Sequence, residues 1–314
     1  MIRPSPSHRL LNLVQTMLIL GGMAAIAWVV LGSIFGPEVT VLLIALSLAG
    51  LALAPSLSRE FLLRGYRARP LGPREWPEGV AVLHELARRA GLPRPPELWY
   101  VPSQVPNAFA MGPPEESAVC VSDALLRLLT PRELAAVLAH EVAHIANRDL
   151  WLMGLADAMS RAVSVASWLG QFLLIINLPL MAAGAATFPW GALLLLVFSP
   201  TIMALLQLSL SRRREYDADL GAVELTGDPE ALASALTKLE RLAGRFWEEI
   251  FLPGRRIPEP SLLRTHPPTE VRVARLRALA PRRKMPALSP PRAAPPAGLQ
   301  IPPPPGFRRS GYWF

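Results

Sequence analysis

The chain of 314 residues has a net charge of +8 at neutral pH, and 51% of its residues are hydrophobic but only 18% charged, which excludes an ordinary soluble globule. Its single cysteine, Cys120, excludes an intramolecular disulfide and a thiolate cluster, so any metal has to be held by His and carboxylate side chains. The arginines flank apolar segments and fill the C-terminal tail, a distribution that indicates membrane orientation before nucleic-acid binding.

Two uncharged, mostly apolar stretches, 10–35 and 39–57, open the chain, and each is long enough to cross a hydrocarbon core of about 30 Å. A cleaved signal peptide is the alternative for the first, because Arg3 and Arg9 precede it. That stretch is too long for a signal peptide, and the second follows it almost at once. We therefore predict a transmembrane hairpin over residues 10–57.

A second hairpin is predicted within residues 162–211, which contain no Asp, Glu, Lys or Arg. The sequence AAGAATFPW, at 182–190, divides them into spans near 163–181 and 190–209. A buried hairpin in a large soluble core is the alternative, but both hairpin loops lack Lys and Arg. The basic residues gather on the other side of the predicted spans: Arg59, Arg64, Arg67, Arg69, Arg161 and the run Arg212 to Arg214. By the positive-inside rule, both termini and the segment 58–161 face the cytoplasm, and the protein is a multi-pass protein of the cytoplasmic (inner) membrane.

Between the hairpins the chain carries charge throughout. EGVAVLHELARRAG, at 78–91, has helical spacing of apolar residues and a Gly stop, and ELWYVP, NAFAMG and SAVCVS predict three short strands. A further helix begins near 132, with Thr130 as N-cap, Pro131 at the first helical position and Glu133 at the third. Its sequence, ELAAVLAHEVAHIAN, is apolar on nearly all sides, so its polar side chains need buried partners.

His140 and His144 lie four positions apart on this helix, so both imidazoles can reach one ion. Glu141 points beside that ion, where it can take a proton from a metal-bound water and pass it to a leaving amine. Two satisfied core histidines are the alternative. HELAR illustrates it, since His84 is followed by Arg88 where a second histidine would stand, and we expect His84 on a helix surface.

A catalytic zinc takes three protein ligands and keeps an open position. The first acidic residues after the second hairpin lie in SRRREYDADLGA, where Glu215 and Asp219 are four apart on an expected helix. Glu215 as ligand and Asp219 as acceptor for a ligand histidine would satisfy both the zinc and the tautomer of the imidazole. A charged membrane-boundary stretch is the alternative, and the spacing alone does not separate the two.

Four features follow one another along the chain: HEVAHIANRD, the uncharged hairpin, SRRREYDADLGA and THPPTEVRVARL. This order resembles the HtpX-type membrane zinc metallopeptidases, gluzincin-like enzymes related to the CAAX prenyl endopeptidases. The resemblance covers the chain from the first span to about residue 280. It implies one Zn²⁺ per chain with His140, His144 and Glu215 as ligands, Glu141 as general base and Asp219 in support. The implied fold is a mainly α membrane protein, with four transmembrane helices in two hairpins and a cytoplasmic α+β zincin-like catalytic domain that holds a small sheet.

The resemblance also assigns residues outside the metal helix. PNAFAMG, at 106–112, matches an edge strand that such peptidases pair with the substrate backbone, so Asn107 and Ala108 are expected to bind substrate. His266 and Arg272 match an HP…R motif and are candidate stabilisers of the tetrahedral intermediate. An ordinary strand and turn is the alternative for the first segment, and a helix start for the second.

The predicted organisation has five parts. These are the transmembrane hairpin 10–57, the cytoplasmic segment 58–161 with the HExxH helix, the second transmembrane hairpin 162–211, the cytoplasmic helical segment 212–280 with the third ligand, and the Pro-rich, basic tail 281–314. We expect the tail to be disordered, either passive or in contact with lipid headgroups.

The activity that the resemblance implies is that of a zinc-dependent endopeptidase, which cuts cytoplasmic segments of misfolded membrane proteins in protein quality control. Its expected partners are membrane-protein or unfolded polypeptide substrates and the lipid bilayer, and no nucleic acid. A CAAX-type prenyl-protein endopeptidase and a non-catalytic membrane adaptor that retains the metal site are the alternatives. Four spans count against the first, since those relatives have more, and the intact Glu141 and ligands count against the second. Asn147 and Asp149 match the family pattern, but both can simply close the helix.

Overall fold

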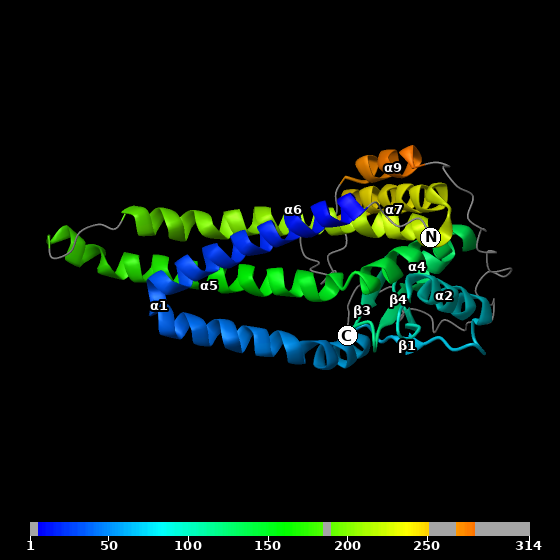
Figure 1. The fold of residues 1–314 in the computed structure, drawn as a ribbon, viewed down its shortest axis with the longest axis horizontal. Helices are drawn as coiled ribbons and strands as arrows, with labels where there is room; N and C mark the ends of the chain where they lie inside the picture. The colour runs from blue at the N-terminus through cyan, green and yellow to red at the C-terminus, as the bar shows by residue number, and fades with distance from the viewer. Residues whose placement is uncertain (1–5, 185–189, 251–267, 280–314) are drawn as a thin grey trace, which may run out of the picture. The chain divides into compact units, whose positions relative to one another are not determined.

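A computed structural model describes residues 6–184, 190–250 and 268–279 (Figure 1). Their contacts divide the chain into two compact units. The first, here called the membrane unit, comprises Met1–Ala54 and Leu150–Arg214, and the second, the sheet unit, comprises Pro55–Asp149 and Glu215–Phe314.

Long apolar helices make up the membrane unit. They are the first part of α1 (Pro6–Gly65) and most of α5 (Asp149–Ala182) and α6 (Trp190–Thr226). Trp168 and Leu18 each expose 69% of their surface, which suits side chains that face lipid rather than water. The chain is therefore a membrane protein, as the sequence predicts.

Within the described residues, three helical stretches are long and apolar enough to cross a membrane: Asn12–Phe35, Asp149–Leu180 and Trp190–Thr226. The helix α1 breaks at Gly36, whose φ of 78° lies in the left-handed region that favours glycine. Beyond it α1 continues as a helix to Gly65, and its stretch Pro37–Ser47 is apolar. The predicted span 39–57 is not confirmed, and four spans in two hairpins stay a prediction.

A proline inside α6 is accommodated by polar side chains of α5. Pro200 has no N–H, so the Leu196 carbonyl one turn earlier loses its helical donor. Ser167 Oγ donates to that carbonyl at 2.6 Å, and Gln171 Nε2 donates to it at 3.2 Å. These two bonds satisfy the Leu196 carbonyl, which lipid could not do.

The sheet unit contains a sheet of four described strands in the order β1-β2-β4-β3. The three predicted strands are confirmed as β2 (Glu97–Val101), β3 (Ala108–Met111) and β4 (Ala118–Ser122), and β1 (Arg69–Pro70) is a short addition that the sequence did not predict. β2 and β4 run parallel, whereas β3 pairs antiparallel with β4. β3 therefore forms one edge of the described sheet.

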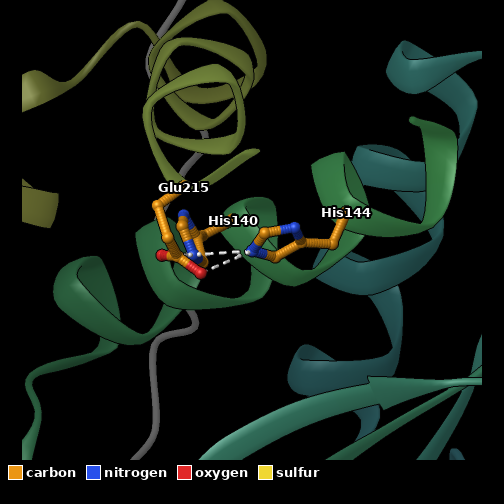
Figure 2. Close-up of side chains that lie close together, drawn as sticks. All are labelled: His140, His144 and Glu215. Carbon is orange, nitrogen blue, oxygen red and sulfur yellow. Dashed lines mark hydrogen bonds and ion pairs between the residues drawn. The ribbon is translucent and has the colours of Figure 1, made fainter. Parts of the chain in front are cut away.

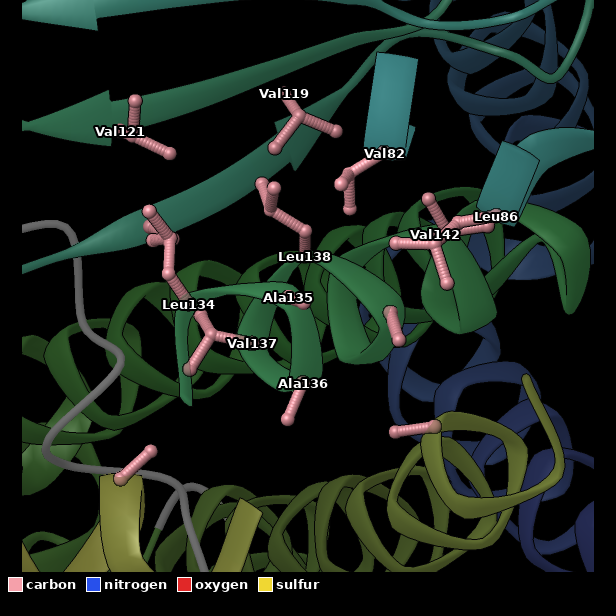
Figure 3. Packing of buried hydrophobic residues seen from close by; sticks show 14 of the residues in the cluster. Val82, Leu86, Val119, Val121, Leu134, Ala135, Ala136, Val137, Leu138 and Val142 are labelled. Atoms are coloured by element: carbon pink, nitrogen blue, oxygen red, sulfur yellow. The ribbon is translucent and has the colours of Figure 1, made fainter. Parts of the chain in front are cut away.

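Helices cover the two faces of this sheet. α2 (Pro77–Ala90), which ends at the left-handed Gly91, and α4 (Pro131–Ala146) pack on one face. Figure 3 shows that core, in which Val119 and Val121 of β4 meet Leu138 of α4. On the other face, Val101 and Cys120 pack with Leu63 from the end of α1. The remaining helices are α3 (Asp123–Leu128), which was not predicted, α7 (Pro229–Ile250) and α9 (Thr269–Ala278).

The start of α4 agrees with the sequence prediction in detail. Thr130 is the N-cap, Pro131 is the first helical residue, and Glu133 completes a capping box. Glu133 also accepts hydrogen bonds from Ser234 and Lys238 of α7, at 2.6 and 2.7 Å. These contacts fix the helix that carries the two histidines.

Candidate metal centre

His140, His144 and Glu215 meet at one point inside the sheet unit (Figure 2). The two imidazole Nε2 atoms are 3.1 Å apart, and the Glu215 carboxylate oxygens lie 3.4 Å from His140 Nε2 and 3.6 Å from His144 Nε2. The histidines come from successive turns of α4, and the glutamate comes from α6.

The distances are close to those around a zinc ion. Ligands held about 2.0–2.2 Å from a tetrahedral Zn²⁺ stand about 3.3–3.6 Å from one another. The two carboxylate distances fall in this range, and the two Nε2 atoms, at 3.1 Å, are slightly closer. Carboxylates face the other ring nitrogens, since Asp219 Oδ1 lies 3.2 Å from His140 Nδ1 and Asp149 Oδ2 lies 2.8 Å from His144 Nδ1. If each imidazole carries its proton on Nδ1, the lone pairs of the two Nε2 atoms point towards each other and towards the Glu215 carboxylate. A cation bound between these three groups relieves the repulsion among them.

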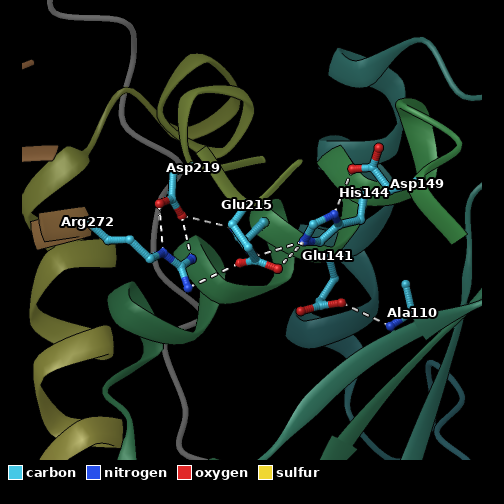
Figure 4. A network of polar contacts seen from close by, with 8 residues as sticks. Ala110, Glu141, His144, Asp149, Glu215, Asp219 and Arg272 are labelled. Carbon is cyan, nitrogen blue, oxygen red and sulfur yellow. Dashed lines mark hydrogen bonds and ion pairs between the residues drawn. The ribbon is translucent and has the colours of Figure 1, made fainter. Parts of the chain in front are cut away.

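Arg272 of α9 ties this group to the rest of the unit (Figure 4). Its guanidinium donates from Nε and Nη2 to the two oxygens of Asp219, and its Nη1 lies 3.1 Å from Glu215 Oε2. All three side chains are buried. Although burial by itself would lower the pKa of Arg272, the hydrogen bonds to Asp219 raise it, so the guanidinium stays charged.

Glu141 lies beside the ligand group and is held by the sheet. Its Oε2 accepts a hydrogen bond of 2.9 Å from the backbone N–H of Ala110 in β3 (Figure 4). Burial raises the pKa of Glu141, and the neighbouring imidazoles act in the opposite direction. A buried carboxylate with a raised pKa is suited to take and return a proton.

The electrostatics of His140 reflect the two carboxylates around it. Burial by itself would lower its pKa, but hydrogen bonding to Asp219 and Glu215 raises the pKa to about 10 in the absence of a metal ion. The site therefore attracts positive charge, which either a proton or a metal ion can supply.

A close approach between α6 and α4 brings Glu215 to the histidines. A methyl group built at Gly221 would lie 2.8 Å from the Cβ of Ala143, which is closer than real Cβ atoms come. Ala143 stands directly before His144, so a side chain at position 221 would displace one helix from the other.

Only some backbone groups of the edge strand β3 point away from its neighbour β4, towards the unpaired edge of the described sheet. Asn107 is paired with Ser122 of β4, because its N–H donates to Ser122 Oγ and its C=O accepts from the Ser122 N–H. In an antiparallel pair, successive residues alternate between bonding inward and facing outward. Ala108 rather than Asn107 therefore has backbone groups that face the open edge.

The structure thus brings together Glu141, the three ligand candidates, Asp219 and Arg272, and it places Asn107 and Ala108 at the end of the strand that holds Glu141. His266 lies outside the described residues. His84 is exposed on α2, as expected. The sequence did not anticipate the contacts of Ala110 and Asp149, since neither spacing nor residue type places them at the site.

Residues 75–280 match the family described as Peptidase family M48. The chain belongs to peptidase family M48. Proteins named "Protease HtpX homolog" resemble this chain over most of their length. The protein from Kineococcus radiotolerans is 36% identical over 290 residues, which cover 87% of this chain and 98% of that protein. The protein from Thermococcus kodakarensis is 36% identical over 80% of this chain and 90% of its own.

The M48 assignment and the apolar helices together make this protein a membrane metalloprotease by family. The crystal structure of S. mikatae Ste24p is similar at 18% identity, with a TM-score of 0.47, over 87% of this chain and 66% of that one.

Proposed function

We propose that this M48 family member is a zinc-dependent endopeptidase of the cytoplasmic membrane that holds one Zn²⁺ through His140, His144 and Glu215. The meeting of two imidazole nitrogens and a carboxylate at tetrahedral separations, with Glu141 beside them, carries the proposal. Three protein ligands leave a fourth position for water or substrate. When bound, zinc lowers the pKa of water and polarises a carbonyl group.

Glu141 acts as the general base and then as the acid. It takes a proton from the attacking water and returns it to the leaving amine. The Ala110 N–H holds one of its oxygens, so the carboxylate cannot swing away from the ligand group. Burial raises its pKa, which makes the carboxylate a stronger base towards the attacking water than an exposed glutamate.

The substrate is an extended polypeptide segment that adds to the open edge of β3. Backbone pairing with Ala108 recognises main chain rather than sequence, and Asn107 can add its side-chain amide. Segments without stable structure can adopt this conformation. We therefore propose cytoplasmic segments of misfolded membrane proteins as the substrates.

Arg272 contributes by holding Glu215 in place. Its guanidinium is bonded to Asp219 and lies against Glu215, which supports a positioning role rather than direct contact with the substrate carbonyl. Stabilisation of the tetrahedral intermediate by His266 stays a prediction.

The decisive experiment compares the wild type with Glu141→Gln after purification in detergent. We expect about one zinc per chain in both proteins, and casein cleavage by the wild type alone. Glu60→Gln, at an exposed carboxylate that pairs with Arg64, is the control that should cleave normally. A zinc-loaded wild type that cuts nothing, or a Glu141→Gln variant that cuts equally well, would refute the proposal.

Ligand identity and orientation need their own measurements. Glu215→Ala should bind zinc far more weakly, and unchanged affinity would move the third ligand elsewhere. Reporter fusions after residues 36 and 186 should signal the non-cytoplasmic side, whereas a cytoplasmic signal would overturn the proposed orientation.

A further inference from the structure

His144 has a carboxylate partner that the sequence left without a role. Asp149 Oδ2 lies 2.8 Å from His144 Nδ1, and the Asp149 side chain is 4% exposed (Figure 4). On an unbroken helix, residues five apart point about 140° away from each other, so such a pair cannot meet. The contact therefore depends on how the chain leaves α4.

The junction between α4 and α5 makes this contact possible. α4 ends at Ala146, Asn147 is its C-cap, and Arg148 has a φ of 57° in the left-handed region. That conformation is unfavourable for a residue with a side chain. It reverses the chain locally, so that Asp149, the first residue of α5, faces back to His144. A residue that served only to end helix α4 would not need to face the imidazole of His144.

The two ligand histidines are thus held by separate elements. Asp219, which faces His140, sits on α6 in a network with Arg272 and Glu215. Asp149 faces His144 from the junction between α4 and α5. A carboxylate at Nδ1 fixes the imidazole with Nδ1 protonated and with the Nε2 lone pair directed to the other ligands.

We propose that Asp149 is a positioning residue for the metal, which orients the His144 imidazole through its contact with Nδ1. The inference rests on the proposed zinc site, and it concerns metal binding before any cleavage occurs. A carboxylate in this place strengthens the ligand, and its loss is expected to weaken metal binding about 10–100-fold.

Asp149→Asn is the sharpest variant. Asparagine has nearly the same shape as aspartate, so the junction should survive the change while the charge is lost. Asp157→Asn is the matched control, because Asp157 lies on the same helix α5 and pairs with Arg161 at an exposed position. Neither variant replaces a zinc ligand.

The readouts are zinc affinity by competition with a chelating dye, the absorption spectrum of the Co²⁺-substituted protein, and the melting temperature of the zinc-free protein. We expect Asp149→Asn to bind zinc about 10–100-fold more weakly and to change the Co²⁺ spectrum, with an unchanged zinc-free melting temperature. Asp157→Asn should match the wild type in all three measurements.

Two outcomes would overturn the inference. One is a zinc affinity for Asp149→Asn within twofold of the wild type. The other is a zinc-free protein that no longer folds in both Asp149→Asn and Asp149→Ser, since serine also caps a helix and the residue would then serve the fold alone. A wild type that binds zinc but cleaves nothing would refute the proposed protease and leave this test intact.

Discussion

Arg272 on α9 binds Asp219 on α6 through two hydrogen bonds, from Nε to Oδ2 at 2.8 Å and from Nη2 to Oδ1 at 2.6 Å. This bidentate pair is buried and reaches the Glu215 carboxylate as well. A segment far along the chain thereby sets the position of a candidate zinc ligand. Arg272, a residue of the HP…R motif, is therefore part of the candidate metal centre.

Replacing Arg272 by Gln should destabilise the fold by about 3–5 kcal/mol, because the partner carboxylate stays buried without its cation. Zinc affinity should fall with it, since Glu215 loses a neighbour that orients it. Chemical unfolding in detergent and zinc competition would measure the two effects. Arg277→Gln on the same helix breaks an exposed pair with Glu230 and should change stability by less than about 0.5 kcal/mol. Equal effects at the two positions would contradict the assignment.

Gly221→Ala should weaken zinc binding although it adds only a methyl group. The new Cβ would lie 2.8 Å from the Cβ of Ala143, and neither atom can move without its helix. Overpacking of this kind costs about 1–3 kcal/mol and shifts backbone. The control is Gly191→Ala on the same helix, where a Cβ meets nothing within 4 Å and helix propensity alone should apply. Normal zinc affinity in Gly221→Ala would show that the helices can separate without cost.

Zinc binding should release a proton from His140. Because the metal-free pKa of this imidazole is raised to about 10, the side chain is protonated at neutral pH, whereas zinc binds only the neutral form. Apparent zinc affinity should therefore rise about tenfold per pH unit between pH 7 and 8.5. Calorimetry in buffers of different ionisation enthalpy would count the released protons. An affinity that does not change over this pH range would contradict the prediction.

Glu133 should make the stability of the sheet unit dependent on acid pH. Although burial by itself would raise the pKa of Glu133, the hydrogen bonds from Lys238 and Ser234 lower it to about 2. Since this pKa lies below the unfolded value near 4.5, the stabilisation is fully present above about pH 4.5 and is lost as the pH falls towards 2. Glu133→Gln should cost about 1–3 kcal/mol at pH 7 and much less at pH 3.

Unfolding curves at pH 7 and pH 3 would test this difference. The control is Glu85→Gln, because the pKa of Glu85 is also lowered to about 2, by Arg88 and Arg89, but at the protein surface. We expect no measurable change in stability there, since solvent screens an exposed pair. A penalty for Glu133→Gln that is the same at both pH values would contradict the prediction.

The sequence by itself determined the local features of this protein. The capping box at Thr130 and Glu133, the helix stop at Gly91 and the three strands all follow from residues that are neighbours in the chain. The spacing of His140 and His144 likewise indicates a shared ion, because helix geometry fixes where side chains four apart point. The span 39–57 stays a prediction, since composition alone indicates it.

Only the tertiary structure decided which distant groups complete the site. Spacing alone left Glu215 between a zinc ligand and a boundary charge, and only the resemblance favoured the ligand. The close approach of Gly221 in α6 to Ala143 brings the Glu215 carboxylate to the histidines. On a continuous helix Asp149 would point away from His144, but the left-handed backbone of Arg148 turns the chain and brings the two side chains together. Such contacts depend on packing between segments and on single backbone angles, which neither spacing nor hydropathy encodes.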